Sequence, residues 1–243
     1  MPGTACKNCP LRKRDLFTPF TEDELTFMQS FKTGELNVDP GTTILMEGSN
    51  SPQLYTVLDG MGTRYKTLEN GKRQVINFLF PGDFTGLQAG IMGEMQHSVE
   101  ATTPMTLCAF RRNDLWQVFR QHPERAYDLT WIAAVEEHFL GETIASLGRR
   151  DATQRIAWAL VRIHERLKAA GLGKDGRVPL PFRQQDLADA LGLSLVHTNK
   201  TLKALRSMGL AQWSDGALKL SKISALADLA MIDLERPQQR PLM

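Results

Sequence analysis

The spacing of hydrophobic and polar positions changes along the chain. From about residue 33 to residue 113, short β-forming runs are separated by turn pairs such as Pro40-Gly41 and Asn70-Gly71. The runs predicted as strands are TTILM, LYTVLD, TRYKTL, QVINFLF, SVEAT and TLCAF. Many short strands at close spacing favour a sandwich or a barrel. A short helix is predicted ahead of them, over residues 20–32.

Helical spacing follows the β-rich region. A helix is predicted over residues 113–121 with an Asn cap, and a longer one from Pro123 to about residue 147. The longer helix is apolar over so wide an arc that two sides must be buried, one against the barrel and one against a second copy of the chain. The alternative is a fully buried core helix. The predicted dimer seam consists of Leu129, Ile132, Val135, Phe139 and Leu147.

Beyond a polar hinge near Leu147–Asp151, the spacing predicts an amphipathic helix over residues 152–170 and a loop after it. Residues 183–213 then predict two short helices. Gly192 suits the sharp turn between them, and Ser194 can cap the second helix. This spacing is typical of a helix-turn-helix, in which the second helix enters the major groove of DNA.

One face of that second helix carries side chains suited to DNA. Asn199 can pair with adenine, Lys200 can donate to guanine, and Leu195 or Val196 can touch a thymine methyl group. Lys203 and Arg206 suit phosphates, and a hairpin at 210–220 is similar to a wing. The predicted DNA-binding residues are Ser194, Leu195, Val196, His197, Asn199, Lys200, Lys203 and Arg206. The alternative is an ordinary helical hairpin with a solvated basic face.

Composition and charge narrow the function. Apolar residues make up 42% and charged residues 23% of the 243 residues, which excludes a disordered chain or a fibre. Residues 1–150 carry 15 basic and 18 acidic side chains, and residues 151–243 carry 14 and 9, so the C-terminal part favours a polyanionic partner. We expect a cytoplasmic protein without a membrane span. No phosphate loop, HExxH or G-x-S-x-G motif indicates an enzyme.

The β-rich domain, the long helix and the winged helix-turn-helix together resemble the CRP/FNR family of bacterial transcription regulators, over about residues 15–225. PGDFTG at 81–86, HSVEA at 97–101 and the segment 183–213 carry the resemblance. It implies an α+β fold with an N-terminal jelly-roll β-barrel of the cyclic-nucleotide-binding type, a long dimerisation helix and a C-terminal winged helix-turn-helix. The corresponding domains are residues 1–122, 123–150 and 151–243.

The resemblance also implies partners. It implies a homodimer that binds double-stranded DNA at a palindromic promoter site and acts on RNA polymerase. Many members carry Glu where this chain has Val196 and Arg where it has Lys200. The missing Glu removes a partner for cytosine, so the preferred half-site does not carry over from the family.

The nucleotide pocket of the family is degenerate here. Members that bind cyclic nucleotides hold the ribose with a Glu after the Gly of a PGDFTG-like segment, and the phosphate with an Arg-Ser pair. Here Leu87 follows Gly86, and the pair is His97-Ser98. Leucine cannot accept a hydroxyl hydrogen bond, and histidine lacks the guanidinium fork. We expect no cyclic-nucleotide dependence and a structural His97, the alternatives for His97 being a pH-sensitive group or a haem ligand. The alternative function is a small-ligand-binding barrel without a DNA role.

Three cysteines suggest a different signal. Cys6 and Cys9 form a C-x-x-C pair, and Cys108 lies on the last predicted barrel strand. The oxygen-sensing FNR branch holds an iron–sulfur cluster with a similar set, so the resemblance implies a cluster that responds to redox state or gas. The fourth ligand falls at Asp15 in one family spacing and at Phe17, which cannot ligate, in another. The alternatives are unliganded cysteines with Cys108 as a small apolar residue, or a thiol switch of Cys6 and Cys9.

Overall fold

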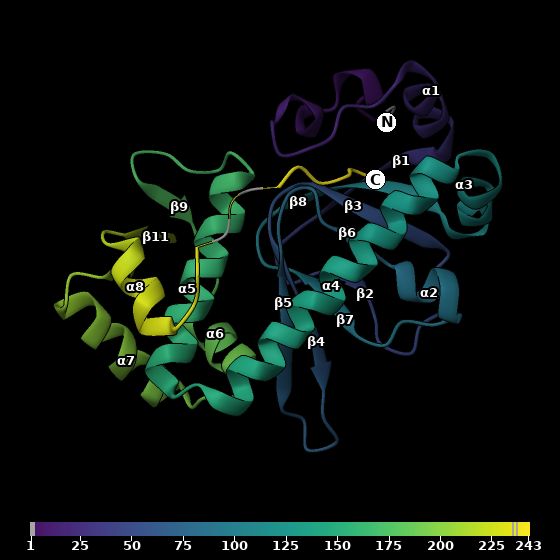
Figure 1. The fold of residues 1–243 in the computed structure, drawn as a ribbon. Coiled ribbons are helices and arrows are strands. Elements are labelled where there is room, and N and C mark those ends of the chain that lie inside the picture. Colours follow the sequence, from purple (N-terminus) through teal and green to yellow (C-terminus); the bar gives the residue numbers. More distant parts are fainter. Residues whose placement is uncertain (1–2, 235, 237) are drawn as a thin grey trace. The chain divides into compact units, whose positions relative to one another are not determined.

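The computed structural model describes residues 3–234, 236 and 238–243, which form two compact units (Figure 1). The first unit comprises residues up to Glu136 together with Gln239–Met243, and the second comprises Glu137–Gln238. The units divide inside the long helix, whereas the sequence placed boundaries at residues 122 and 150. The three-part subdivision therefore stays a prediction.

Two four-stranded antiparallel sheets form the barrel of the first unit, in the orders β1-β8-β3-β6 and β2-β7-β4-β5. The strands are β1 Lys32–Val38, β2 Thr43–Leu45, β3 Gln53–Asp59, β4 Gly62–Thr67, β5 Arg73–Leu79, β6 Phe84–Thr85, β7 Ser98–Ala101 and β8 Met105–Arg111. Each of the six predicted runs overlaps one of these strands. The sequence pattern missed β1, which contains a glycine and two charged residues, and β6, which has only two residues.

The turn pairs between the strands behave as their glycines predict. Gly41, Gly71 and Gly82 all have positive φ. At Gly82 the packing adds a second constraint, because a Cβ atom there would lie 2.1 Å from Cζ of Phe17. Only glycine therefore fits where the N-terminal segment crosses this turn.

Helices cover the barrel of the first unit. They are η1 Cys6–Asn8, η2 Pro10–Lys13, α1 Glu22–Phe31, α2 Leu87–Met92, η3 Arg112–Asp114, α3 Leu115–Gln121 and, as far as Glu136, α4 Pro123–Arg149. Thr21 and Glu24 close a capping box at the start of α1. The predicted Asn cap at residue 113 is wrong: Asn113 lies inside η3, and no side chain caps α3. The sequence pattern also missed α2.

The C-terminal segment belongs to the first unit and was not predicted. The backbone of Arg240 donates to the carbonyl of Leu16 at 2.8 Å and accepts from the N–H of Thr18 at 3.0 Å. Leu242 and Met243 are each only 3% exposed and lie in the same hydrophobic cluster as Phe17 and Cys108. In Figure 1 the yellow C-terminal segment runs beside the purple N-terminal segment.

The second unit surrounds α5 Ala152–Ala169, which begins with a capping box at Asp151 and Gln154. Its predicted apolar face is fully or almost fully buried, and comprises Ile156, Leu160, Ile163 and Leu167. The other elements are β9 Arg177–Pro179, α6 Gln184–Leu191, α7 Leu195–Ser207, β10 Ala211–Ser214, β11 Ala217–Leu220 and α8 Ile223–Ala230, and the strands form one sheet in the order β10-β11-β9. The sequence pattern missed β9, within its predicted loop, and α8. None of the described helices combines the length and apolarity that a membrane span requires.

Candidate nucleic-acid interface

The turn between α6 and α7 has the local chemistry of a helix-turn-helix. Gly192 ends α6 with a φ of +63°, which other residues rarely adopt. Ser194 then caps α7, because its side chain accepts a hydrogen bond from the backbone N–H of His197 at 3.2 Å. At the start of α6, the carboxylate of Asp186 accepts from the backbone N–H of Arg183 at 2.9 Å. Both helix starts are therefore held by side chains of their own.

One face of α7 is anchored in the core of the second unit. Thr198 and Leu205 are completely buried, Thr201 is 5% exposed, and Leu202 is half-buried. The anchored positions follow the three- and four-residue spacing of one helix face.

The opposite face of α7 is open to solvent. Val196 is 79% exposed, although an apolar side chain gains nothing from contact with water. All the predicted DNA-binding residues are exposed: Ser194, Leu195, Val196, His197, Asn199, Lys200, Lys203 and Arg206. None of the eight is acidic, and three of them, Lys200, Lys203 and Arg206, are cations, so this face presents positive charge and hydrogen-bond donors.

The hairpin after α7 has the geometry predicted for a wing. β10 and β11 pair in register from Ala211 opposite Leu220 to Ser214 opposite Ala217. Asp215 and Gly216 form the turn, and both have positive φ, as tight hairpins require. Lys219 on β11 is exposed.

Comparison with known proteins agrees with this architecture. Residues 35–122 match the cyclic nucleotide-binding domain, and residues 154–229 match the Crp-like helix-turn-helix domain. The nitrogen fixation regulation protein FixK of Rhizobium meliloti is 32% identical over 82% of each chain. The chain belongs to the CRP/FNR family of transcription regulators. The predicted family and α+β fold are therefore confirmed.

Two further relatives support the membership of this CRP/FNR regulator. The transcriptional activator protein FnrL of Cereibacter sphaeroides is 28% identical over 84% of this chain and 82% of its own. The structure of FixK2 from Bradyrhizobium japonicum superposes with a TM-score of 0.74 and 26% identity, covering 82% of this chain and 96% of that one. The regulator is thus a DNA-binding protein, and the family is one of regulators rather than enzymes. A barrel module without a DNA role does not agree with this membership.

The residues predicted to form the degenerate effector pocket lie in the barrel unit. Gly86 precedes α2 with a φ of +96°, and Leu87 packs half-buried against the core of the first unit. The hydroxyl of Ser98 accepts a hydrogen bond from the backbone N–H of Glu47 at 3.0 Å. An apolar side chain and a hydroxyl that already accepts a hydrogen bond therefore stand at two of the predicted pocket positions.

His97 is the third residue predicted for the pocket and is 9% exposed. Its Nε2 atom has no hydrogen-bond partner among the residues described. Burial, and then the charges of Arg64 and Lys66, lower its pKa to about 4. The ring is consequently neutral at pH 7.

The three cysteines of the CRP/FNR regulator come together at one edge of the first unit. Cys6 lies in η1, Cys9 directly precedes η2, and both pack against the hydrophobic cluster that contains Cys108 of β8. All three are free. Burial raises the pKa of Cys108 to about 12 and also raises that of Cys6. The thiols of Cys6 and Cys108 are therefore protonated at neutral pH in this structure.

A complete set of ligands is not assembled around the thiols. Across the described ranges, no group of three or more His, Cys, Asp and Glu side chains has the arrangement of a metal site. Asp15 is exposed, and its backbone carbonyl accepts from the side chain of Gln239 at 3.2 Å. Phe17, the alternative position, is buried in the core.

The residues of the predicted dimer seam on α4 do not share one environment: some are buried within the chain and others are exposed to solvent. Leu129 and Ile132 are buried in the core of the first unit, and Phe139 stacks on Trp158 at 6.1 Å in the second. Val135 is 40% exposed and Leu147 half-buried. The more open apolar pair is Leu140 and Ile144, which lie outside the predicted seam and are 41% and 71% exposed. The apolar arc is thus shared between intrachain packing and an open face.

One buried group in the barrel escaped sequence reasoning. Arg64 of β4 is 7% exposed and forms an ion pair with Glu136 of α4 at 2.7 Å. It also donates to the carbonyl of Phe84 at 2.7 Å. The available signal was a charged residue inside a predicted strand, but its partner is 72 residues away in the chain. This pair connects the barrel directly to the long helix.

Proposed function

We propose that this regulator binds a palindromic DNA site as a homodimer, with the N-terminal half of α7 in the major groove. The observation that carries the proposal is the division of α7 into a buried face and an open basic face. Asn199 and Lys200 would contact base edges, whereas Lys203 and Arg206 would contact phosphates. Val196 adds an apolar side chain to the open face, and this side chain would contact a thymine methyl group.

Replacing Lys200 with alanine tests the base readout. The variant loses donors to guanine, so we expect binding to weaken by about 1–3 kcal/mol and the preference at one base pair to relax. Lys174→Ala, an exposed lysine of the same unit outside α7, is the matched control and should change affinity less than about twofold. Fluorescence anisotropy with single-position site variants measures both quantities.

Two results would contradict the readout. An unchanged base preference in Lys200→Ala removes Lys200 from the readout. Failure of the wild-type protein to prefer any palindromic site, under both oxic and anoxic conditions, contradicts the whole proposal.

The homodimer would form along α4. Leu140 and Ile144 support it, because they lie one turn apart with exposed apolar side chains. Ile144→Asp should shift the protein to monomer in sedimentation velocity, and with it weaken DNA binding. Met231→Asp replaces another residue that is 71% exposed, outside α4, and should remain dimeric. A dimeric Ile144→Asp would contradict this interface. The family resemblance further supports contact with RNA polymerase, which transcription with purified components would measure.

We also propose that the regulator acts without cyclic nucleotides. The neutral His97, the apolar Leu87 and the engaged Ser98 support this, because a cyclic phosphate and ribose require a cation and an acceptor. Isothermal titration with cyclic AMP and cyclic GMP should detect no binding. Micromolar affinity for either nucleotide would overturn the proposal.

The signal we propose is redox state or gas, sensed through an iron–sulfur cluster held by Cys6, Cys9 and Cys108. The convergence of three thiols from separate segments supports this, as does the likeness to FnrL. The three thiolates would be ligands and Asp15 remains the proposed carboxylate, although the described residues do not bring three or more such groups into the arrangement of a metal site. Such a cluster would be the group that reacts with oxygen and that gives the protein its colour.

Protein purified without oxygen tests the cluster. We expect brown colour and bound iron in the wild type, none in Cys108→Ser, and both in the neighbouring control Thr106→Ser. A colourless wild type after anaerobic reconstitution with iron and sulfide would end the cluster proposal. If the DNA affinity of that colourless protein still changed on reduction, a dithiol switch of Cys6 and Cys9 would be favoured instead.

A further inference from the structure

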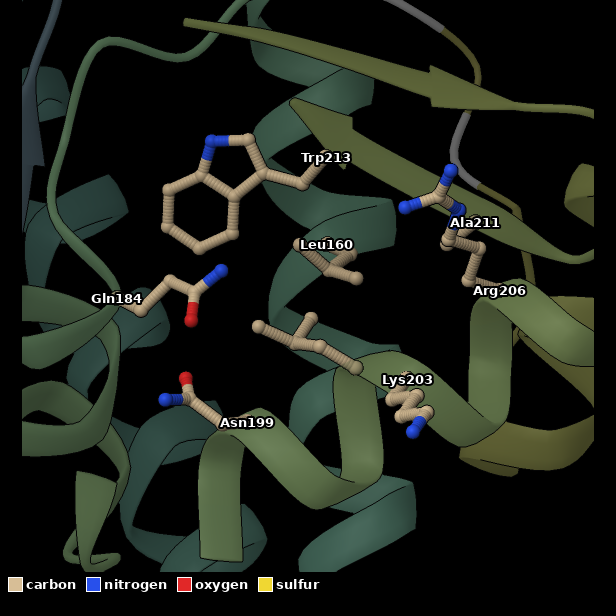
Figure 2. Close-up of a pocket in the computed structure, with 8 residues that line it drawn as sticks. Leu160, Gln184, Asn199, Lys203, Arg206, Ala211 and Trp213 are labelled. Carbon is tan, nitrogen blue, oxygen red and sulfur yellow. The ribbon is translucent and has the colours of Figure 1, made fainter. Parts of the chain in front are cut away.

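A cavity of about 170 Å³ opens beside α7 in the second unit (Figure 2). It is lined by α5, α6, α7 and β10, through Leu160, Gln184, Asn199, Leu202, Lys203, Arg206, Ala211 and Trp213. We propose that this cavity binds a small planar aromatic carboxylate, and that its occupation competes with DNA. The second part rests on the proposed DNA-binding role of α7.

The size and the apolar surface of the cavity suit one aromatic ring. A dry cavity of about 150 Å³ is large enough for benzene. Leu160 is completely buried, and Leu202 and Trp213 are half-buried, so a ring would replace water at apolar side chains. The indole Nε1 of Trp213 donates to the carbonyl of Leu180 at 2.9 Å, which holds the indole ring in place. An aromatic ligand would therefore meet a positioned aromatic surface.

The polar groups of the cavity select the substituents. Figure 2 shows the carboxamides of Gln184 and Asn199 pointing toward one another on one side, and Lys203 and Arg206 on the other. Within the described structure, neither cation has an ion-pair or hydrogen-bond partner, and no acidic side chain lines the cavity. A carboxylate would pair with the cations, and a hydroxyl group would bond to the carboxamides.

The same side chains link the cavity to DNA. Asn199, Lys203 and Arg206 line the cavity and also belong to the face proposed to meet DNA. A bound carboxylate would occupy the cations that otherwise meet phosphate. A DNA phosphate would pair with the cations without contacting the apolar side chains of the cavity. Binding in the cavity therefore requires an aromatic ring, whereas phosphate contact does not.

Titration of the full-length protein with 3-hydroxybenzoate, without DNA, tests the site directly. For a ligand of this size we expect a Kd on the order of 0.1–1 mM by isothermal titration. The neutral analogue 3-hydroxybenzamide and inorganic phosphate should each bind at least about tenfold more weakly. Phosphate binding as tight as that of the benzoate, or no saturation by about 10 mM, would overturn the proposal.

Variants distinguish a specific contact in the cavity from a general attraction of the anion to the positive charge of the helix. Arg206→Gln should weaken 3-hydroxybenzoate about tenfold or more. Lys200→Gln removes the same charge from the same helix outside the cavity, and should change the Kd less than about twofold. Leu202→Phe keeps every charge but fills the cavity, and should abolish binding without a lower Tm. Equal losses in Arg206→Gln and Lys200→Gln would contradict a specific site.

The competition is a separate measurement. At constant ionic strength, 3-hydroxybenzoate at ten times its Kd should raise the apparent Kd for DNA about tenfold, while 3-hydroxybenzamide should not. Direct binding without this effect would keep the site and overturn the competition. Absence of any DNA binding would contradict the proposed readout by α7 and leave the titration result standing.

Discussion

Replacing Leu242 with alanine probes a contact that no local sequence pattern anticipates. Leu242 is 3% exposed and lies in the core cluster of the first unit with Phe17 and Cys108. Its backbone carbonyl accepts a hydrogen bond from the buried Arg125 at 3.2 Å, and this bond is unaffected by the substitution. The variant therefore changes only the apolar packing of the side chain.

The expected loss follows from burial. Leu→Ala substitutions at buried sites cost about 2–5 kcal/mol, as lost transfer free energy plus the cavity left behind. The C-terminal segment is short and can partly relax into the cavity, so we expect the lower part of this range, about 2–3 kcal/mol. With a urea m-value of about 2 kcal/mol/M, the midpoint of the first unit should fall by about 1–1.5 M.

Urea unfolding measured by circular dichroism and tryptophan fluorescence gives the result. Met231→Ala, at a position 71% exposed, is the control and should stay within about 0.5 kcal/mol of the wild type. An unchanged midpoint for Leu242→Ala would refute the reasoning, because the side chain would then not occupy the core of the first unit.

Three further substitutions have defined outcomes. Arg64→Met leaves Glu136 and the carbonyl of Phe84 without their donor, and should cost about 2–4 kcal/mol in the same urea assay, whereas a loss under 1 kcal/mol would contradict a buried ion pair. His97 has a pKa of about 4 when folded and an ordinary value of 6.5, so the unfolded chain binds the proton preferentially; stability should fall by up to about 3 kcal/mol as pH drops from 6.5 to 4. His97→Gln should lack this part of the pH dependence, and identical profiles would contradict it. Gly82→Ala should lower Tm, because φ is positive and the new Cβ meets Phe17; an equal Tm would contradict that packing.

Much of the DNA-binding site was predictable because its determinants are local. Gly192, Ser194 and the three- and four-residue spacing of α7 act within a few residues, through backbone conformation, capping and amphipathicity. The turn glycines of the barrel act in the same way. Elements without such local signals were missed. β9, which pairs with the wing strands, lies in a Gly-rich segment predicted as a loop, and α2 follows Gly86 without a capping side chain.

The sequence by itself determined the two kinds of unit, the helix-turn-helix and the open face of α7, since each follows from periodicity and turn chemistry within a short window. Only the tertiary structure decided which apolar side chains of α4 are buried within the chain, because periodicity reveals a face but not its partner. It also decided the Arg64–Glu136 pair and the position of Leu242 in the core. These contacts join residues distant in sequence, and their energy depends on desolvation and packing that exist only once the chain has folded.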